Sequence, residues 1–167
     1  MRASLSTMST LEFRYWPKSL HIGPGSLADL PDLMAELRRQ RALVVCGRTV
    51  AAGDMLASVR QALGAGLAGV FTGVEAHTPL AAVEAGLEAA RGCQADTIIS
   101  VGGGSTIDAA KGIAILDASV GDLAPYQVTR GEDGAAERPA LDGGSLVHIA
   151  VPTTAGSASE VMPTAGI

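Results

Sequence analysis

The sequence is poor in aromatic side chains, in cysteine and in long apolar runs, and each shortage excludes a class of protein. Aromatic residues make up 3% of the 167 positions, so bulky rings cannot fill a core. The two cysteines, Cys46 and Cys93, lack metal-ligand spacing and fit a reducing, cytoplasmic compartment. No run of about 18 apolar residues occurs, which excludes a helical membrane span. Residues 1–10 lack the apolar stretch of a signal peptide, so we expect a flexible tail.

Basic charge is scarce as well. Twelve Lys and Arg residues stand against 17 Asp and Glu residues, giving a net charge of −5. The basic residues are scattered, which argues against a nucleic-acid-binding face. Their one cluster, Arg38, Arg39 and Arg41, follows an apolar helical pattern, and we expect it to complement the dipole at that helix's C-terminus.

Small residues are abundant: the chain has 29 alanines and 21 glycines, and 47% of its residues are hydrophobic. A chain of this length suffices for one domain with a buried core. Since so many side chains are small, we expect helices to pack closely on a sheet.

The hydrophobic pattern predicts strands and helices in alternation. The predicted strands are 13–16, 19–22, 42–46, 68–72, 97–101 and 146–151, and the predicted helices are 26–40, 54–63, 80–91 and 105–116. The last four strands are uninterrupted apolar runs, which indicates parallel crossovers and a sheet covered on both faces. The predicted fold is therefore α/β, doubly wound, with a mostly parallel sheet. Residues 117–144 predict a long surface excursion at the edge of a cleft or at an oligomer contact.

The strongest local motif is a glycine triplet, Gly102 to Gly104, that directly follows a predicted buried strand and precedes a helix. This order places free backbone N–H groups and the positive end of a helix dipole at the carboxyl edge of the sheet, where ligands of such folds bind. The missing Cβ atoms let a pyrophosphate approach the backbone, and Ser105 and Thr106 supply hydroxyl groups.

The spacing of this loop leaves alternatives open. Ile107 stands where the dinucleotide fingerprint has its third glycine, and the loop does not end as a Walker A motif does. A nucleotide-binding loop and a purely structural tight turn both fit. Asp108, in the first helical turn, is compatible with a ligand contact and with an ion pair to Lys111.

A second loop, rich in hydroxyl groups, follows the last predicted strand and is expected to lie beside the first. Thr153, Thr154 and Ser157 can donate hydrogen bonds to phosphate or carboxamide oxygens. Ser157 and Glu160 also have the spacing of a capping box at a helix start, and the two roles are compatible.

Together, the two loops closely resemble the paired signatures of the iron-containing (group III) alcohol dehydrogenase family. The resemblance rests on residues 100–111 and 151–161 and runs from about Phe13 to the end of the sequence. It implies that residues 11–167 form a Rossmann-like, NAD(P)-binding N-terminal domain of the fold shared with dehydroquinate synthase. The family's C-terminal helical domain, which holds a divalent metal, is expected to be absent from this chain.

The resemblance also implies roles for individual residues. The cofactor pyrophosphate is assigned to Gly103, Gly104 and Ser105, with Asp108 as the acid near it, and further cofactor contacts to Thr153, Thr154 and Ser157. His77 takes the place of a family asparagine near the cofactor. The His-Thr-Pro sequence that begins at His77 resembles the maleylacetate reductase branch, whereas residues 105–111 resemble the general alcohol dehydrogenase branch.

One departure from the family concerns the choice between NAD and NADP. Where NAD-preferring members carry an aspartate, this chain has Gly47 followed by Arg48. An acid there accepts hydrogen bonds from ribose hydroxyls and repels a 2′-phosphate, whereas glycine and arginine remove the repulsion. We hypothesise that NADPH is tolerated or preferred; the alternative is a solvated arginine after a tight turn.

The metal is expected elsewhere. In the family, an aspartate and three histidines beyond the second loop bind iron or zinc. The three histidines here, His21, His77 and His148, lack ligand spacing, and His148 is interpreted as a core or strand-edge residue. We therefore predict no metal ligand and no catalytic residue in this chain, and cofactor binding without turnover.

Three interpretations stay open. The first is the cofactor-binding part of an oxidoreductase acting on a small alcohol, aldehyde or keto acid, including the maleylacetate reductase type, with a homo-oligomer as an option. The second is a stand-alone, non-catalytic nucleotide-binding module. The third, a lyase of the dehydroquinate synthase type, shares the fold and the glycine loop but lacks the wording of the second loop.

Overall fold

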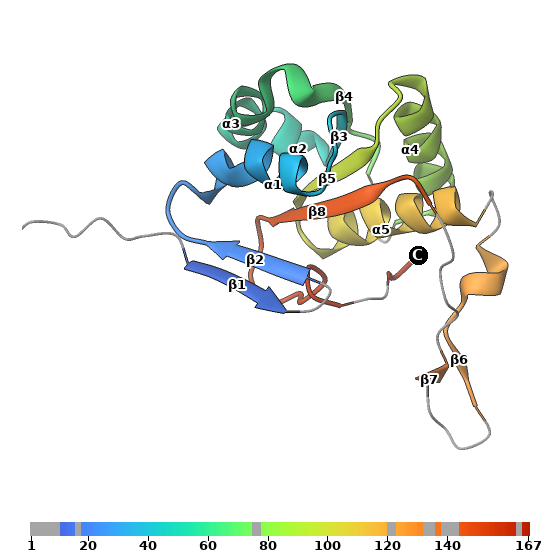
Figure 1. Ribbon diagram of the computed structural model, residues 1–167. Helices are drawn as coiled ribbons and strands as arrows, with labels where there is room; N and C mark the ends of the chain where they lie inside the picture. The colour runs from blue at the N-terminus through green and yellow to red at the C-terminus, as the bar shows by residue number, and fades with distance from the viewer. Residues whose placement is uncertain are drawn as a thin grey trace, which may run out of the picture.

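The computed structural model describes residues 11–15, 18–74, 78–119, 123–131, 136–137, 144–162 and 165–167. A parallel sheet lies at its centre, with helices on both of its faces (Figure 1). The predicted N-terminal tail, residues 1–10, falls outside the described residues.

The central sheet has four strands in the order β4-β3-β5-β8, and all of its pairings are parallel. The strands are β3 (Ala42–Cys46), β4 (Leu67–Phe71), β5 (Thr97–Gly102) and β8 (Val147–Pro152). Both inner strands, β3 and β5, are buried along their whole length, as a sheet covered on both faces requires. The predicted doubly wound α/β fold is confirmed.

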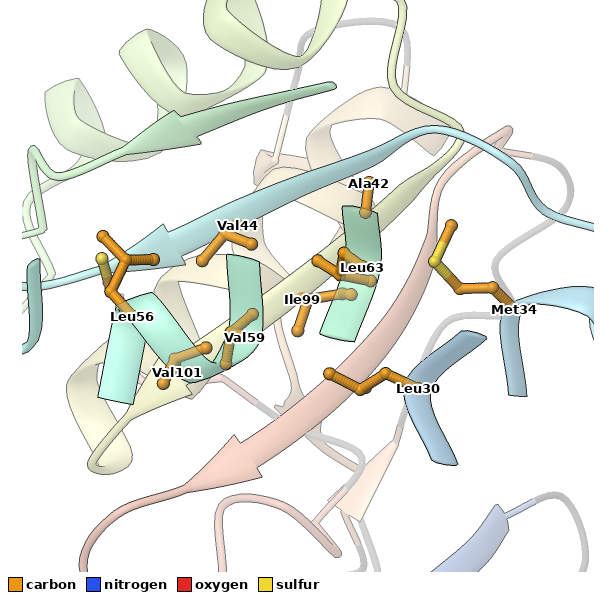
Figure 2. Close-up of a cluster of buried hydrophobic side chains, with 10 residues drawn as sticks. Leu30, Met34, Ala42, Val44, Leu56, Val59, Leu63, Ile99 and Val101 are labelled. Carbon is orange, nitrogen blue, oxygen red and sulfur yellow. The ribbon is translucent and has the colours of Figure 1, made fainter. Parts of the chain in front are cut away.

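Successive residues of the inner strands point to two separate cores, one on each face. Val44 and Ile99 face α1 (Leu30–Glu36) and α3 (Asp54–Leu63), as Figure 2 shows. Leu43, Val45 and Ile98 belong to the other core, which is covered by α4 (Leu80–Gly92) and α5 (Gly104–Ala118). The chain moves from the first face to the second between α3 and α4. The strand order therefore runs from β3 to β4 on one side and to β5 and β8 on the other, as in a doubly wound sheet.

A small residue also allows two helices, α4 and α5, to pack closely against each other. A Cβ atom on Gly86 of α4 would lie 2.3 Å from Cδ1 of Ile113 in α5, a side chain with no exposed area. Helices α4 and α5 therefore approach each other at a point where alanine would be too large.

The predicted helix at 26–40 is wrong in extent. Ser26–Asp29 form a 3₁₀ turn (η1), and α1 occupies only Leu30–Glu36. Pro31 lies in the first turn of α1, where its missing N–H group costs nothing. At the other end the chain leaves the helix, and Arg38 adopts a left-handed conformation with φ of 57°.

The expected role of the arginine cluster is also wrong, because no basic residue lies in the last turn of α1. Arg41 instead serves the end of α4: its Nη2 donates to the carbonyl of Cys93 at 2.6 Å and its Nε to that of Gln94 at 3.0 Å. A cation thus meets the terminal carbonyl groups of a helix that is distant in the sequence.

Asp96 fixes the same corner of the fold. Its carboxylate accepts hydrogen bonds from the N–H groups of Gln40 and Arg41 and from the hydroxyl of Thr97. Burial acts to raise the pKa of Asp96, but these donated bonds outweigh it and hold the pKa below its ordinary value.

The remaining elements are short. They are the antiparallel pair β1 (Leu11–Tyr15) and β2 (Lys18–Ile22), then α2 (Arg48–Ala51), η2 (Gly64–Gly66), η3 (Ala124–Tyr126), β6 (Thr129–Arg130) and β7 (Ala136–Glu137). The β6–β7 ribbon extends away from the sheet (Figure 1), and residues 127–130 are exposed, as a surface excursion requires. Its contact with an oligomer partner or a cleft stays a prediction.

His148 is a partly buried strand residue, as its apolar neighbours predict. Its Nε2 lies 2.8 Å from the hydroxyl of Ser100 on β5. Burial, reinforced by the nearby Lys111 ammonium group, lowers the pKa of His148 to about 4. The folded protein therefore keeps this imidazole neutral where the unfolded chain, with a pKa near 6.5, takes up a proton.

We predict that replacing Gly86 with alanine lowers the free energy of unfolding by about 1–2 kcal/mol, because the added methyl group overlaps Ile113. The matched control is Gly92→Ala at the last residue of α4, where a Cβ atom meets nothing within 4 Å. This control should leave stability unchanged within about 0.5 kcal/mol or raise it slightly. Urea unfolding of both variants measures the difference, and equal stabilities would contradict the packing described for Gly86.

We further predict that His148 makes stability depend on pH between about 4 and 6.5. The unfolded state binds the extra proton in this window, so the free energy of unfolding falls as the pH falls, by a total on the order of 3 kcal/mol. Urea unfolding at several pH values should show a smaller slope for His148→Leu than for wild type. Ser100→Ala, which keeps the imidazole, should retain the slope; an unchanged slope in His148→Leu would sink the prediction.

Candidate functional site

Three loops meet at the carboxyl edge of the sheet because three neighbouring strands end there at the same level. Cys46 of β3 is in register with Val101 of β5, and Gly102 of β5 with Pro152 of β8. Gly47 and Thr153 therefore begin loops on either side of the glycine triplet. The predicted proximity of the glycine loop and the hydroxyl-rich loop is confirmed.

The edge between β3 and β5 is also the switch point of the fold. From β3 the chain passes through α3 to β4 on one side, while β5 lies on the other side and is followed by α5 on the opposite face. Connections that leave in opposite directions open a crevice at the strand ends, where ligands of doubly wound sheets bind.

The glycine loop forms the start of the 15-residue helix α5. Gly103 is its N-cap, and no side chain caps this helix end. The Gly103 carbonyl accepts hydrogen bonds from the N–H groups of Thr106 at 3.0 Å and Ile107 at 3.1 Å. The uncapped N-terminal turn and the positive dipole end of α5 thus lie at the carboxyl edge of the sheet, an arrangement that suits an anion.

Space, rather than backbone conformation, requires glycine in this loop. Gly103 has an extended backbone (φ −84°, ψ −168°) that any residue can adopt. A Cβ atom at Gly102, however, would lie 2.5 Å from the hydroxyl oxygen of Thr106, and one at Gly103 would lie 3.1 Å from that of Thr154. Gly102 and Gly103 are therefore needed for contacts within the protein. This is the structural role that the sequence left open as an alternative to nucleotide binding.

The second loop is anchored to the first and then runs along the surface. The N–H group of Thr153 donates to the carbonyl of Gly102 at 2.9 Å. Thr153, Thr154 and Ser157 are exposed, so their hydroxyl groups are open to a ligand.

No helix begins at Ser157, contrary to the expectation from its capping-box spacing. Residues 159–161 form a turn, and the Ser157 hydroxyl accepts from the N–H group of Ser159 at 3.4 Å. Gly156 and Ala158 both have positive φ, 93° and 56°, which breaks the helical path. The loop therefore stays irregular next to the glycine triplet.

Asp108 uses both carboxylate oxygens within the protein. Its Oδ1 lies 3.1 Å from Nζ of Lys111, so the ion pair weighed from the sequence is present. Its Oδ2 accepts from the N–H group of Gly166 at 3.2 Å, which ties the segment after the second loop to α5. A cofactor contact by Asp108 remains a prediction.

After β3, at the same edge of the sheet, Gly47 is the N-cap of the short helix α2, and Arg48 is its exposed first residue. A Cβ atom on Gly47 would meet nothing within 4 Å, so packing does not require glycine there. His77, the remaining predicted cofactor residue, lies outside the described residues.

Thr78 is the residue of this region that sequence reasoning missed. It is 1% exposed, has a φ of 42°, and donates its hydroxyl to the carbonyl of Ser105 at 3.0 Å. Nothing in the pattern points to it, because a residue before a proline is expected to be extended.

The described part of the chain meets the requirements of neither a metal centre nor a membrane-spanning helix. No group of three or more His, Cys, Asp or Glu residues there could hold a metal ion. His21 pairs with Asp29 at 3.3 Å and has no third candidate ligand near it. The described residues thus do not fit the metal centre that the resemblance implies for the family. No described helix is long and apolar enough to cross a bilayer.

The known proteins most similar in sequence include reductases and dehydrogenases. Maleylacetate reductase 2 of Cupriavidus pinatubonensis is 39% identical over 101 residues, which cover 60% of this chain and 28% of that protein. The 4-hydroxybutyrate dehydrogenase of Cupriavidus necator is 31% identical over 151 residues, which cover 90% of this chain and 38% of that protein. The chain thus spans about a third of the length of these relatives.

Solved structures agree with the sequence relatives. A 1,3-propanediol oxidoreductase matches with a TM-score of 0.71 and 31% identity, covering 83% of this chain and 34% of that one. A sulfoacetaldehyde reductase of Bifidobacterium kashiwanohense, solved in complex with NAD⁺, matches with a TM-score of 0.66 and 25% identity over 83% of this chain and 35% of that one. The family model for iron-containing alcohol dehydrogenase matches residues 17–167. The chain therefore belongs to the iron-containing alcohol dehydrogenase family.

Proposed function

We propose that this chain is the NAD(P)-binding part of a metal-dependent oxidoreductase that transfers hydride between a nicotinamide cofactor and a small alcohol, aldehyde or keto acid. The observation that carries the proposal is the uncapped N-terminus of α5, reached through three glycines at the switch point of the sheet. Family membership and the NAD⁺ complex of one structural neighbour support the same cofactor class.

In this proposal the cofactor pyrophosphate lies on the backbone of Gly102, Gly103 and Gly104, where N–H groups and the helix dipole favour negative charge. The exposed hydroxyl of Ser105 and those of Thr153, Thr154 and Ser157 add hydrogen bonds from both loops. Asp108 and His77 are assigned positions near the cofactor by the family resemblance alone.

Hydride transfer in this family relies on a metal ion that polarises the alcohol or carbonyl oxygen. Because the described residues do not fit a metal centre, we assign no catalytic step to them. We propose that this chain binds the cofactor without turning over, and that iron or zinc is held by residues beyond those it contains. A cytoplasmic location and homo-oligomerisation stay predictions from the sequence.

No single residue of the chain indicates which class of substrate the enzyme uses. The similarity to maleylacetate reductase 2 supports a keto-acid substrate, whereas the similarity to 4-hydroxybutyrate dehydrogenase supports an alcohol or aldehyde. A stand-alone nucleotide-binding module would use the same site and differ only in having no catalytic partner domain.

We predict that the purified chain binds NADH or NADPH and that Gly103→Ala weakens binding about tenfold. The added Cβ atom would lie 3.1 Å from Thr154 Oγ1, so it would crowd the turn on which the pyrophosphate is proposed to lie. Gly92→Ala, at the far end of α4, is the matched control and should bind as wild type does. Titration of nicotinamide fluorescence gives the dissociation constants. Absence of binding by wild type, or equal affinities for wild type and Gly103→Ala, would refute the proposal.

We also predict that NADPH is tolerated or preferred, so that NADH binds less than tenfold more tightly than NADPH. Arg48→Gln should weaken NADPH binding about tenfold, because a charge-assisted hydrogen bond to the 2′-phosphate is lost, and should leave NADH unchanged. Gly47→Asp, which has free space for its side chain, should shift the preference toward NADH. Parallel titrations give the dissociation constants of both cofactors. Tenfold tighter binding of NADH than of NADPH by wild type would contradict this prediction.

A further inference from the structure

Thr78 combines three features that are unusual for a threonine in a connecting segment. It lies between β4 and α4, it is 1% exposed, and its φ of 42° places it in the left-handed region. β-Branched residues rarely adopt this conformation, and the following Pro79 restricts Thr78 further, because a residue before proline prefers extended backbone. Such a conformation persists only where the surrounding structure holds it in place.

The contact that holds Thr78 is directed at the start of α5. Its hydroxyl donates to the carbonyl of Ser105 at 3.0 Å. Ser105 is the second residue of α5 and is exposed. A buried side chain from the β4–α4 connection therefore reaches the turn that carries the glycine loop.

This hydrogen bond and one on the other side fix the same peptide plane. The peptide unit that joins Ser105 to Thr106 accepts from Thr78 at its carbonyl and donates from its N–H group to the carbonyl of Gly103 at 3.0 Å. With both ends of the plane held, the first turn of α5 is oriented before any ligand arrives. A preorganised turn loses less freedom on binding a phosphate group than a free one does.

We propose that Thr78 is a positioning residue for phosphate binding: it fixes the first turn of α5 and contributes no direct ligand contact. The proposal rests on the proposed function, since it assigns a phosphate-bearing cofactor to that turn. A positioning role of Thr78 differs from a simple packing role in one measurable respect. Loss of the hydroxyl should affect ligands that carry phosphate and spare related ligands that do not.

The test compares adenosine diphosphate with adenosine by isothermal titration calorimetry on the full chain. Thr78→Val keeps the side-chain shape and removes the hydroxyl, so it should weaken binding of adenosine diphosphate and NADH about fivefold, the effect of one lost hydrogen bond. Adenosine binding should stay within about twofold of wild type. Thr78→Ser, which restores the donor, should bind all three ligands nearly as wild type does.

Circular dichroism first establishes that each variant is folded. If Thr78→Val does not fold, Thr78→Gly provides the comparison, because glycine adopts positive φ without strain and also lacks the hydroxyl. Equal affinity of wild type and variant for adenosine diphosphate, or equal weakening for adenosine and adenosine diphosphate, would overturn the positioning role. Failure of wild type to bind either NADH or adenosine diphosphate would instead overturn the proposed function, and this inference with it.

Discussion

The parallel pairing of β5 with both β3 and β8 is the interaction on which the rest of the structure depends. Parallel strands require crossover connections, and these connections supply helices that cover both faces of the sheet. The same pairing sets the carboxyl ends of three strands at one level. The glycine loop, the Gly47–Arg48 loop and the hydroxyl-rich loop are neighbours for that reason, although more than a hundred residues separate Arg48 from Thr153.

Glycine has two separate roles in this protein. Within the helical layer, Gly86 lets α4 and α5 approach more closely than a side chain would allow. At the sheet edge, Gly102 and Gly103 leave room for Thr106 and Thr154. The proposed cofactor site consists largely of backbone, so its rigidity would depend on close packing of this kind.

The sequence predicts most of the fold and the location of the candidate site, since both follow from the spacing of apolar residues and from motifs next to strand ends. The bounds of β3 and α3 agree with the pattern residue for residue. The errors arise where contacts between distant residues decide: Arg41 meets the end of α4, and the loop after β8 turns away from a helix at Gly156 and Ala158. Thr78 was missed for the same reason, because its role depends on Ser105, 27 residues away.

The central claim is that a nicotinamide cofactor binds at the carboxyl edge of the sheet, on the first turn of α5. Amide chemical-shift mapping of the ¹⁵N-labelled chain during titration with NADH or NADPH tests it most directly. If the cofactor binds there, the shifts concentrate at Gly47, at Gly103 to Ser105 and at Thr153 to Ser157. Shifts centred on the opposite edge, around Arg41 and Asp96, or no saturable shifts at all, would contradict it.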